Sequence, residues 1–269
     1  MCMRPIFLKD AGQYVPCNKC PKCIARRVSA WSFRLREQLK ISRTAHFITM
    51  TYDSKYIPIT DNGFLGLRKS DLQKFFKRLR KAQFGNSRGD ISYYSVGEYG
   101  GKTRRPHYHC ILFNAELKLI DPAWNLGMIH YGKVEPASIG YTLKYMHKNK
   151  KQFKLNRYDD RVKEFSLMSK GLGISYLNET MSNWHIADLV NRCYCTLPGG
   201  VKIAMPRYYK DKLYYENERS AIAEAFALEA HEKHLDKLAR YEARDFRNEM
   251  AAIDAAFDRM YSNSLKTKL

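Results

Sequence analysis

The sequence lacks any apolar run long enough to span a membrane, and residues 1–5 lack the apolar stretch of a secretion signal. We therefore expect a cytoplasmic location and no membrane partner. A disulfide framework is also disfavoured, because the seven cysteines are an odd number and three of them fall within residues 17–23. This clustering is typical of a metal site in a reducing compartment.

Acidic residues are scarce relative to basic ones. The chain of 269 residues has 27 Asp and Glu against 47 Lys and Arg, a net charge of +20. Such an excess indicates a polyanionic partner, and nucleic acid is the first candidate. Residues 1–215 contain 38 of the basic residues but only 16 of the acidic ones, whereas the charges nearly balance from Glu216 onward. We therefore expect the working part of the protein before Glu216.

The order of the predicted elements indicates an α+β fold. Apolar residues at steps of three and four predict a helix that follows the cysteines and ends near Ile41. Ser70 and Gln73 form a capping-box pattern that predicts the start of a second helix. Strands are predicted at residues 46–52, 91–99, 107–114 and 127–135, and further helices at residues 137–149 and 216–261, the last as one helix or a pair. This order favours an antiparallel β-sheet with helices packed on one face.

The tripeptide His107-Tyr108-His109 predicts a metal site. On a strand, residues i and i+2 point to the same face, so both imidazoles project together. If the predicted hairpin places Glu98 opposite His107, this carboxylate shares their face. Two imidazoles and one carboxylate suit Mg²⁺ or Mn²⁺.

A pair of tyrosines lies within the predicted helix at residues 137–149. Tyr141 and Tyr145 are four residues apart, which places them on one helical face, and Lys144 and Lys148 follow each by three residues. A phenol needs help to act as a nucleophile, and a neighbouring ammonium favours the phenolate. We predict that these tyrosines are nucleophiles; the alternative is two amphipathic residues with their rings in the core.

Cys17, Cys20 and Cys23 follow a C-x₂-C-x₂-C pattern, in which the thiolates can share one metal ion. A structural zinc site needs a fourth ligand, for which Cys2 is the first candidate and Cys193 and Cys195 are rivals. Reduced thiols without a metal, or an iron–sulfur cluster, are the alternatives.

Several arginines are candidates for contacts with DNA phosphates, since such contacts provide most of the affinity. The predicted DNA-binding residues are Arg26, Arg27, Arg78, Arg104 and Arg105.

Together these motifs resemble the HUH endonuclease superfamily, and more closely the replication initiator proteins of microviruses, the small single-stranded DNA phages, especially the gokushovirus-like branch. The similarity rests on residues 47–52, 97–100, 105–109 and 141–148 and on the cysteine-rich opening. It implies rolling-circle initiation, in which a tyrosine nicks the origin, forms a 5′-phosphotyrosine link and frees a 3′-OH, before a second attack joins the strand. By this resemblance Tyr141 and Tyr145 match the nucleophiles, and His107, His109 and Glu98 the metal ligands.

The resemblance also implies partners and a division of the chain. Single-stranded or supercoiled origin DNA would be the substrate, and the helicase and DNA polymerase of a bacterial host the partners, in the host cytoplasm. We expect a cysteine-rich segment with the first helix, as part of the core, at residues 1–45, the HUH endonuclease core at 46–180, a basic extension at 181–215 and a C-terminal helical region at 216–269. That last region would dimerise, contact the host machinery or cover the sheet.

Two other functions compete with the initiator. An HUH-type transposase or plasmid relaxase uses the same metal and tyrosine geometry. A non-catalytic, zinc-stabilised DNA-binding regulator, in which the histidines are structural, would tolerate the loss of both Tyr141 and Tyr145.

Overall fold

The computed structural model describes residues 2–3, 5–84, 90–135, 139–140, 142–143, 158–240 and 243–264. The chain forms two compact units. One unit, the sheet unit, contains Arg34–Ser175, and the other, the terminal unit, contains Met1–Phe33 with Tyr176–Leu269. The boundary between them falls inside helix α1 (Pro21–Ile41).

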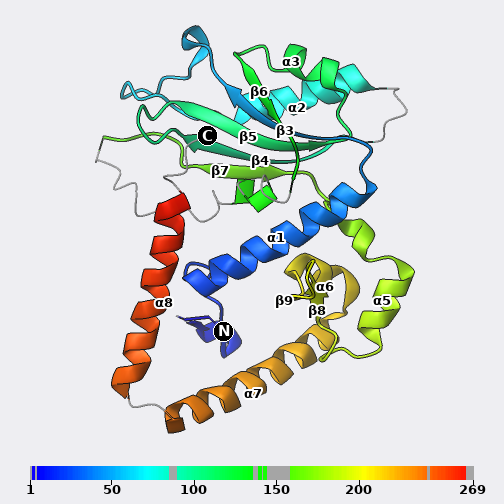
Figure 1. Ribbon diagram of the computed structural model, residues 1–269, viewed down its shortest axis with the longest axis vertical. Coiled ribbons are helices and arrows are strands. Elements are labelled where there is room, and N and C mark those ends of the chain that lie inside the picture. Colours follow the sequence, from blue (N-terminus) through cyan, green and yellow to red (C-terminus); the bar gives the residue numbers. More distant parts are fainter. Residues whose placement is uncertain are drawn as a thin grey trace. The chain divides into compact units, whose positions relative to one another are not determined.

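A five-stranded antiparallel sheet forms the centre of the sheet unit, with the strand order β6-β3-β5-β4-β7 (Figure 1). The strands are β3 (Ala45–Thr51), β4 (Ser92–Tyr99), β5 (Pro106–Phe113), β6 (Ile129–Gly132) and β7 (Phe165–Met168). The predicted α+β class is therefore confirmed. The strand predicted at residues 127–135 is real but shorter.

Helices α2 (Lys69–Gln83) and α3 (Ile120–Ala123) lie on one side of this sheet (Figure 1). That face carries the apolar residues that alternate with the histidines along β5. Each large apolar side chain buried in such a core contributes roughly 1.5–3 kcal/mol. The core contains Ile48 and Met50 of β3, Tyr108, Cys110 and Leu112 of β5, Leu72, Phe75, Phe76 and Leu79 of α2, and Trp124.

The predicted capping box at the start of α2 is wrong. The helix begins at Lys69, so Ser70 lies inside it, and the N-cap residue Arg68 makes no side-chain capping bond. Instead, the Arg68 N–H donates to Tyr108 Oη at 3.0 Å, and Tyr108 Oη donates to the Arg68 carbonyl at 3.0 Å. A buried tyrosine from β5 therefore fixes the chain at this point, a tertiary contact that local sequence does not reveal.

The helix predicted at residues 137–149 is described at four positions only. Ile139, Gly140, Thr142 and Leu143 are helical, and all but the glycine are buried. The remaining positions of that helix lie outside the described residues.

The terminal unit begins with the hairpin β1 (Ile6–Leu8) and β2 (Gln13–Val15), followed by the first part of α1. Further along the chain it contains α5 (Glu179–Ile186), β8 (Tyr194–Thr196), β9 (Lys202–Ala204) and α6 (Arg207–Leu213). Its apolar core joins α1 to these later elements through Phe33, Cys193, Cys195, Met205 and Tyr209.

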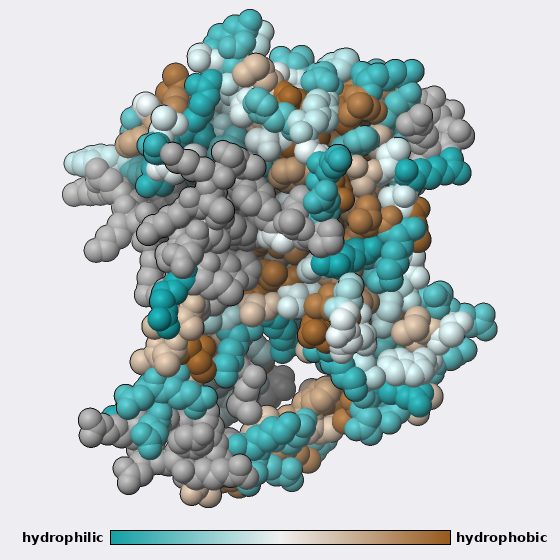
Figure 2. Space-filling model, in the orientation of Figure 1, coloured by the Kyte–Doolittle hydropathy of each residue, from teal (hydrophilic) through white to brown (hydrophobic). Residues whose placement is uncertain are grey.

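The helical C-terminal region is a pair of helices, α7 (Glu216–Arg240) and α8 (Ala243–Ser264), as predicted. Hydrophilic residues predominate on the visible surface of α7, with single apolar residues such as Leu228 between them (Figure 2). Within the described ranges, every helix is too short or too polar to cross a lipid bilayer.

Candidate metal centres

Glu98, His107 and His109 come together on one face of the β4–β5 hairpin, and we call them the His–Glu cluster. Glu98 is opposite His107 and Val96 opposite His109, so the predicted register is confirmed. Glu98 Oε2 lies 3.5 Å from His107 Nε2 and 3.4 Å from His109 Nε2. Two ligands about 2.1 Å from one ion lie about 3.0–3.4 Å apart, so this spacing suits a shared cation.

Hydrogen bonds turn both imidazoles toward the carboxylate. His107 Nδ1 lies 3.2 Å from the Arg105 carbonyl, and His109 Nδ1 lies 3.0 Å from Thr49 Oγ1. With the proton on Nδ1, each ring donates to its oxygen partner and keeps the Nε2 lone pair for a metal. Phe47 also stacks on the His109 ring, with an interplanar angle of 4°.

Burial keeps the two histidines neutral. It lowers the pKa of His107, against the opposing effects of the Arg105 carbonyl and the Glu164 carboxylate. Burial, with the nearby His107 as the second cause, lowers the pKa of His109 to about 3. At neutral pH both rings are therefore in the unprotonated state that a metal ligand requires.

Gly97 has a packing role next to this cluster. A Cβ atom at Gly97 would lie 3.2 Å from side-chain carbons of Leu67, Tyr108 and Phe165. Few Cβ atoms in proteins are so crowded, and these neighbours belong to a close-packed core. The glycine that precedes Glu98 therefore lets the strand lie close to the core while the carboxylate points to the other face.

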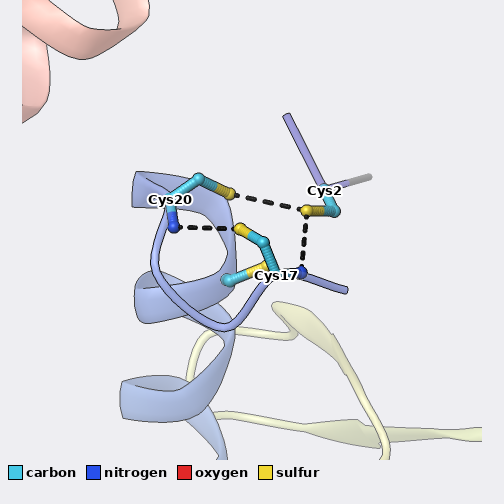
Figure 3. Close-up of side chains that lie close together, drawn as sticks. Cys2, Cys17 and Cys20 are labelled. Atoms are coloured by element: carbon cyan, nitrogen blue, oxygen red, sulfur yellow. Dashed lines mark hydrogen bonds between the residues drawn. The ribbon is translucent and has the colours of Figure 1, made fainter. Parts of the chain in front are cut away.

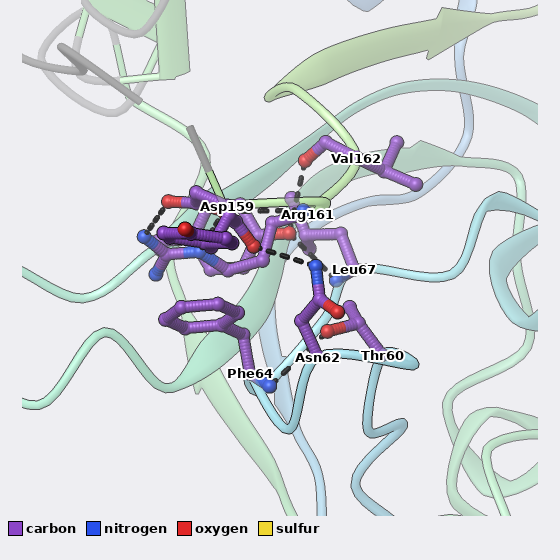
Figure 4. A network of polar contacts seen from close by, with 9 residues as sticks. Thr60, Asn62, Phe64, Leu67, Asp159, Arg161 and Val162 are labelled. Atoms are coloured by element: carbon purple, nitrogen blue, oxygen red, sulfur yellow. Dashed lines mark hydrogen bonds and ion pairs between the residues drawn. The ribbon is translucent and has the colours of Figure 1, made fainter. Parts of the chain in front are cut away.

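A polar network holds the chain just before β7 against the end of β4 (Figure 4). Arg161 forms a two-bonded ion pair with Asp159, with Nε 2.9 Å from Oδ1, and its guanidinium lies over the Phe64 and Tyr99 rings. Tyr99 Oη donates to the Val162 carbonyl at 2.9 Å. The network thus fixes the segment that enters β7 next to the His–Glu cluster.

The predicted nucleophiles and their lysines cannot be placed. Tyr141, Lys144, Tyr145 and Lys148 lie outside the described residues. Leu143, in the middle of this set, is helical and fully buried. The nucleophilic roles stay predictions.

Cys2, Cys17, Cys20 and Cys23 form a second group, the Cys cluster, with all four sulfur atoms within 4.8 Å of one another. The β1–β2 hairpin returns the chain so that Cys2 lies beside Cys17 and Cys20 (Figure 3). The sulfur atoms of Cys2 and Cys20 are 3.8 Å apart. That equals the sulfur–sulfur distance of a tetrahedral zinc site, about 3.8 Å, and far exceeds a disulfide bond of about 2.05 Å.

Main-chain donors surround these thiols. The N–H of Cys17 lies 3.3 Å from Cys2 Sγ, and that of Met3 lies 3.4 Å from Cys20 Sγ. Burial raises the pKa of Cys17, but N–H donors from Lys19 and Cys20 outweigh it and lower this pKa to about 6. A thiolate is therefore accessible near neutral pH, as zinc ligation requires.

The two rival ligands are elsewhere: Cys193 and Cys195 lie buried in the apolar core of the terminal unit. None of the seven cysteines, all within the described ranges, forms a disulfide.

The predicted DNA-binding arginines fall into two groups. Arg26, Arg27 and Arg104 are exposed to solvent. Arg78 Nε donates to the main-chain carbonyl at the end of α3 at 2.8 Å, and Arg105 Nη2 donates to the carbonyl that follows β3 at 2.5 Å. These last two guanidiniums thus also hold the fold, and contact with DNA stays a prediction for all five.

Sequence reasoning missed two neighbours of the His–Glu cluster. Thr49 lies opposite His109 on β3, and strand alternation would have revealed that it shares the histidine face. Glu164 accepts a hydrogen bond from the Tyr99 N–H at 3.1 Å and acts electrostatically on His107. No local pattern around Glu164 points to this position.

Comparison with known proteins identifies relatives of this chain. The family model for replication-associated protein ORF2 matches residues 45–150, which include the whole His–Glu cluster. The chain is 29% identical over 222 residues to replication-associated protein ORF2 of Spiroplasma virus 4, covering 75% of this chain and 68% of that protein. It is 28% identical over 218 residues to replication-associated protein VP4 of Bdellovibrio phage phiMH2K, covering 73% and 66%.

A third relative is replication-associated protein ORF4 of Chlamydia phage 1, 24% identical over 226 residues, with 74% of this chain and 53% of that protein covered. The chain thus spans about two thirds of the length of the first two relatives and about half of the third. No solved structure matches the chain. Through residues 45–150, the chain belongs to the replication-associated protein ORF2 family, as the motifs of its sequence predict.

Proposed function

We propose that this protein is a rolling-circle replication initiator that nicks origin DNA with a tyrosine and a divalent metal ion. The observation that carries the proposal is the His–Glu cluster on the central strands of the sheet, inside the segment that matches a replication-associated family. A His-x-His motif on the middle strand of an antiparallel sheet supports an HUH-type core. Nearby carboxylate and imidazole donors suit Mg²⁺ or Mn²⁺.

The cluster's residues supply the charge balance of the site. His107 and His109 offer neutral Nε2 atoms, and Glu98 offers one negative oxygen. A bound divalent ion would polarise the scissile phosphate and stabilise charge that develops on it. Because the three ligands together carry one negative charge, a net positive charge remains for the DNA backbone.

The chemistry then requires a nucleophile, and we assign it to Tyr141 and Tyr145. The phenol oxygen of one tyrosine loses its proton and bonds to the phosphorus, while the bond to the 3′ oxygen breaks and that oxygen gains a proton. The products are a 5′-phosphotyrosine and a 3′-OH that a host polymerase can extend. Lys144 and Lys148 favour the phenolate, and the second tyrosine serves the later strand transfer.

The Cys cluster has a different role in this proposal. Four thiols at tetrahedral spacing, with main-chain donors around them, suit a closed structural zinc site with no open position for a substrate. Zinc there would connect Cys2 to the start of α1 and stabilise the short hairpin between them.

Two other functions are weaker. A transposase or relaxase would share the geometry, but the relatives carry the name replication-associated. A non-catalytic regulator would need the His–Glu cluster only for folding. Charged and imidazole groups that close together, buried without a cation, are an expensive way to stabilise a sheet.

The decisive experiment uses single-stranded DNA from the origin region with a label at its 3′ end, incubated with Mn²⁺ and separated under denaturing conditions. A 5′-phosphotyrosine link leaves this label on the protein. We expect a labelled adduct with the unmodified protein and none with Tyr141→Phe/Tyr145→Phe, although both bind the DNA. The control Tyr158→Phe, at an exposed tyrosine outside the motif, should form the adduct normally. Absence of both adduct and cleavage with the unmodified protein would favour the regulator.

A further inference from the structure

The β1–β2 hairpin exposes an unusual amount of aromatic and aliphatic surface for so small an element. Phe7 is 49% exposed and Tyr14 is 72% exposed, and Ile6 and Leu8 are also exposed. Three-residue strands form only a marginal hairpin by themselves, which makes this surface expensive unless a partner covers it. The Cys cluster fixes both ends of the hairpin, because Cys2 precedes it and Cys17 follows it.

Strand alternation separates the two kinds of apolar side chain. Phe7 pairs directly with Tyr14, and their rings lie 5.0 Å apart at an angle of 54°. Ile6 and Leu8 point to the other face of the hairpin. One face therefore presents two neighbouring aromatic rings to solvent.

The surroundings of this aromatic pair are strongly cationic. Residues 2–27 contain six basic residues and one acidic residue, Asp10. Of the basic side chains described there, all are exposed: Lys9, Lys19, Lys22, Arg26 and Arg27. A surface that combines exposed aromatic rings with cations on adjacent turns is complementary to an unpaired nucleic acid strand, in which bases stack on the rings and phosphates contact the cations.

We propose that the hairpin of residues 6–15 is a second DNA-contacting site, at which unpaired bases of a single strand stack on Phe7 and Tyr14. Lys19, Lys22 and Arg26 contact the phosphates of the same strand. The site is distinct from the His–Glu cluster, because it belongs to the terminal unit and contains no nicking residue. It rests on the proposed function only in taking DNA as the ligand, and the Cys cluster acts as its support.

Fluorescence anisotropy with labelled oligo(dT) and the full chain tests this site. The measurement is made in EDTA-free buffer without added Mg²⁺ or Mn²⁺, so that nicking plays no part and the zinc stays bound. We expect Phe7→Ala/Tyr14→Ala to raise the Kd at least about tenfold, since loss of base stacking weakens binding by that order for each base. Phe7→Trp/Tyr14→Trp should bind like the unmodified protein. Phe84→Ala/Tyr215→Ala, at rings 91% and 79% exposed elsewhere, should also leave the Kd unchanged.

A salt titration tests the phosphate contacts. Lys19→Ala/Lys22→Ala should flatten the dependence of log Kd on log salt by about one to two, in proportion to the phosphate charges that these lysines neutralise. If these lysines instead only balance the charge of the zinc thiolates, zinc content falls and the salt slope stays the same, which would overturn their assignment. Zinc content and melting temperature of every variant confirm that the fold is intact.

Other occupants of the hairpin give distinct results. Binding of the unmodified chain to vesicles of phosphatidylserine and phosphatidylcholine, but not to oligo(dT), would show a membrane site and overturn the proposal. Self-association that disappears in Phe7→Ala/Tyr14→Ala, with unchanged oligo(dT) binding, would overturn it in favour of a dimer contact. Failure of the nicking proposal is separately recognisable, because Tyr141→Phe/Tyr145→Phe would then still form adducts, whereas its oligo(dT) affinity does not depend on nicking.

Discussion

The two candidate metal centres of this chain differ in their donors and in their supports. The His–Glu cluster has two nitrogen donors and one oxygen donor on the central strands of a five-stranded sheet. The Cys cluster has four sulfur donors around a two-stranded hairpin and the first turn of α1. Three hard or intermediate donors leave positions for water and phosphate, whereas four thiolates complete a tetrahedron. The donor sets thus separate a centre that can act on a substrate from one that stabilises a fold.

Removal of a donor from the open centre should have the largest effect. We expect His107→Ala to lower the rate of origin cleavage about 1,000-fold, because several kcal/mol of metal-dependent stabilisation of the transition state are lost. The control His130→Ala changes an exposed histidine on the neighbouring strand β6 and should cleave at the normal rate. Single-turnover cleavage of a labelled origin oligonucleotide measures both. Equal rates for the two variants would remove the functional difference between the centres.

Removal of a donor from the closed centre should act on stability instead. Cys20→Ser should reduce zinc from one ion per chain to nearly none and lower the melting temperature by about 10 °C, because zinc binding contributes directly to folding free energy. Elemental analysis and a thermal melt give the two quantities. Cys193→Ala, at a cysteine buried in an apolar core, should keep its zinc even if its stability falls. Full zinc occupancy in Cys20→Ser would contradict the four-thiolate site.

Acid should destabilise the open centre through its histidines. In the unfolded chain His109 has a pKa of about 6.5, whereas burial and the nearby His107 hold its pKa in the fold at about 3. Between these values the unfolded state binds a proton that the folded state excludes, so stability falls as pH drops below 6.5. From pH 7 to pH 5 this amounts to about 2 kcal/mol. Urea unfolding of the chain without divalent ions should show this loss, and His109→Asn should show less of it; parallel pH profiles would contradict the assignment.

The smallest expected effect comes from the orientation of one ring. Thr49→Val removes the oxygen partner of His109 Nδ1 and should weaken Mn²⁺ binding about tenfold, a common cost when a partner of a metal ligand is lost. Isothermal titration with Mn²⁺ measures the change. Thr44→Val, which removes a hydrogen bond to the Ala115 carbonyl away from the site, should bind Mn²⁺ as the unmodified protein does. Identical affinities for all three proteins would show that Thr49 does not orient the ring.

The predictable part of the fold and of the site followed from periodicity. Alternation along residues 107–112 put the two histidines on one face and Tyr108, Cys110 and Leu112 in the core, and the hairpin register placed Glu98 beside them. The spacing of three cysteines and a returning segment likewise predicted that Cys2 completes the group. Each of these inferences needed only strand geometry and short separations along the chain.

The missed features depend on contacts between distant segments. Ser70 has the local pattern of a helix cap, but Tyr108, about 40 residues later, binds the main chain of Arg68 and shifts the start of the helix. Glu164 reaches the cluster only because β7 pairs with β4, a pairing across a long connection. Sequence patterns carry no information on such contacts, because any of many polar residues could satisfy them.

The most direct test of the central claim is to map the residue that becomes linked to DNA. The adduct formed with origin DNA and Mn²⁺ is digested with nuclease and protease, and the peptide that carries residual nucleotide is sequenced by mass spectrometry. The proposal predicts a nucleotide on Tyr141 or Tyr145, and no linked peptide in His107→Ala. A nucleotide on any other residue, or cleavage of the origin without a covalent link, would contradict the tyrosine mechanism.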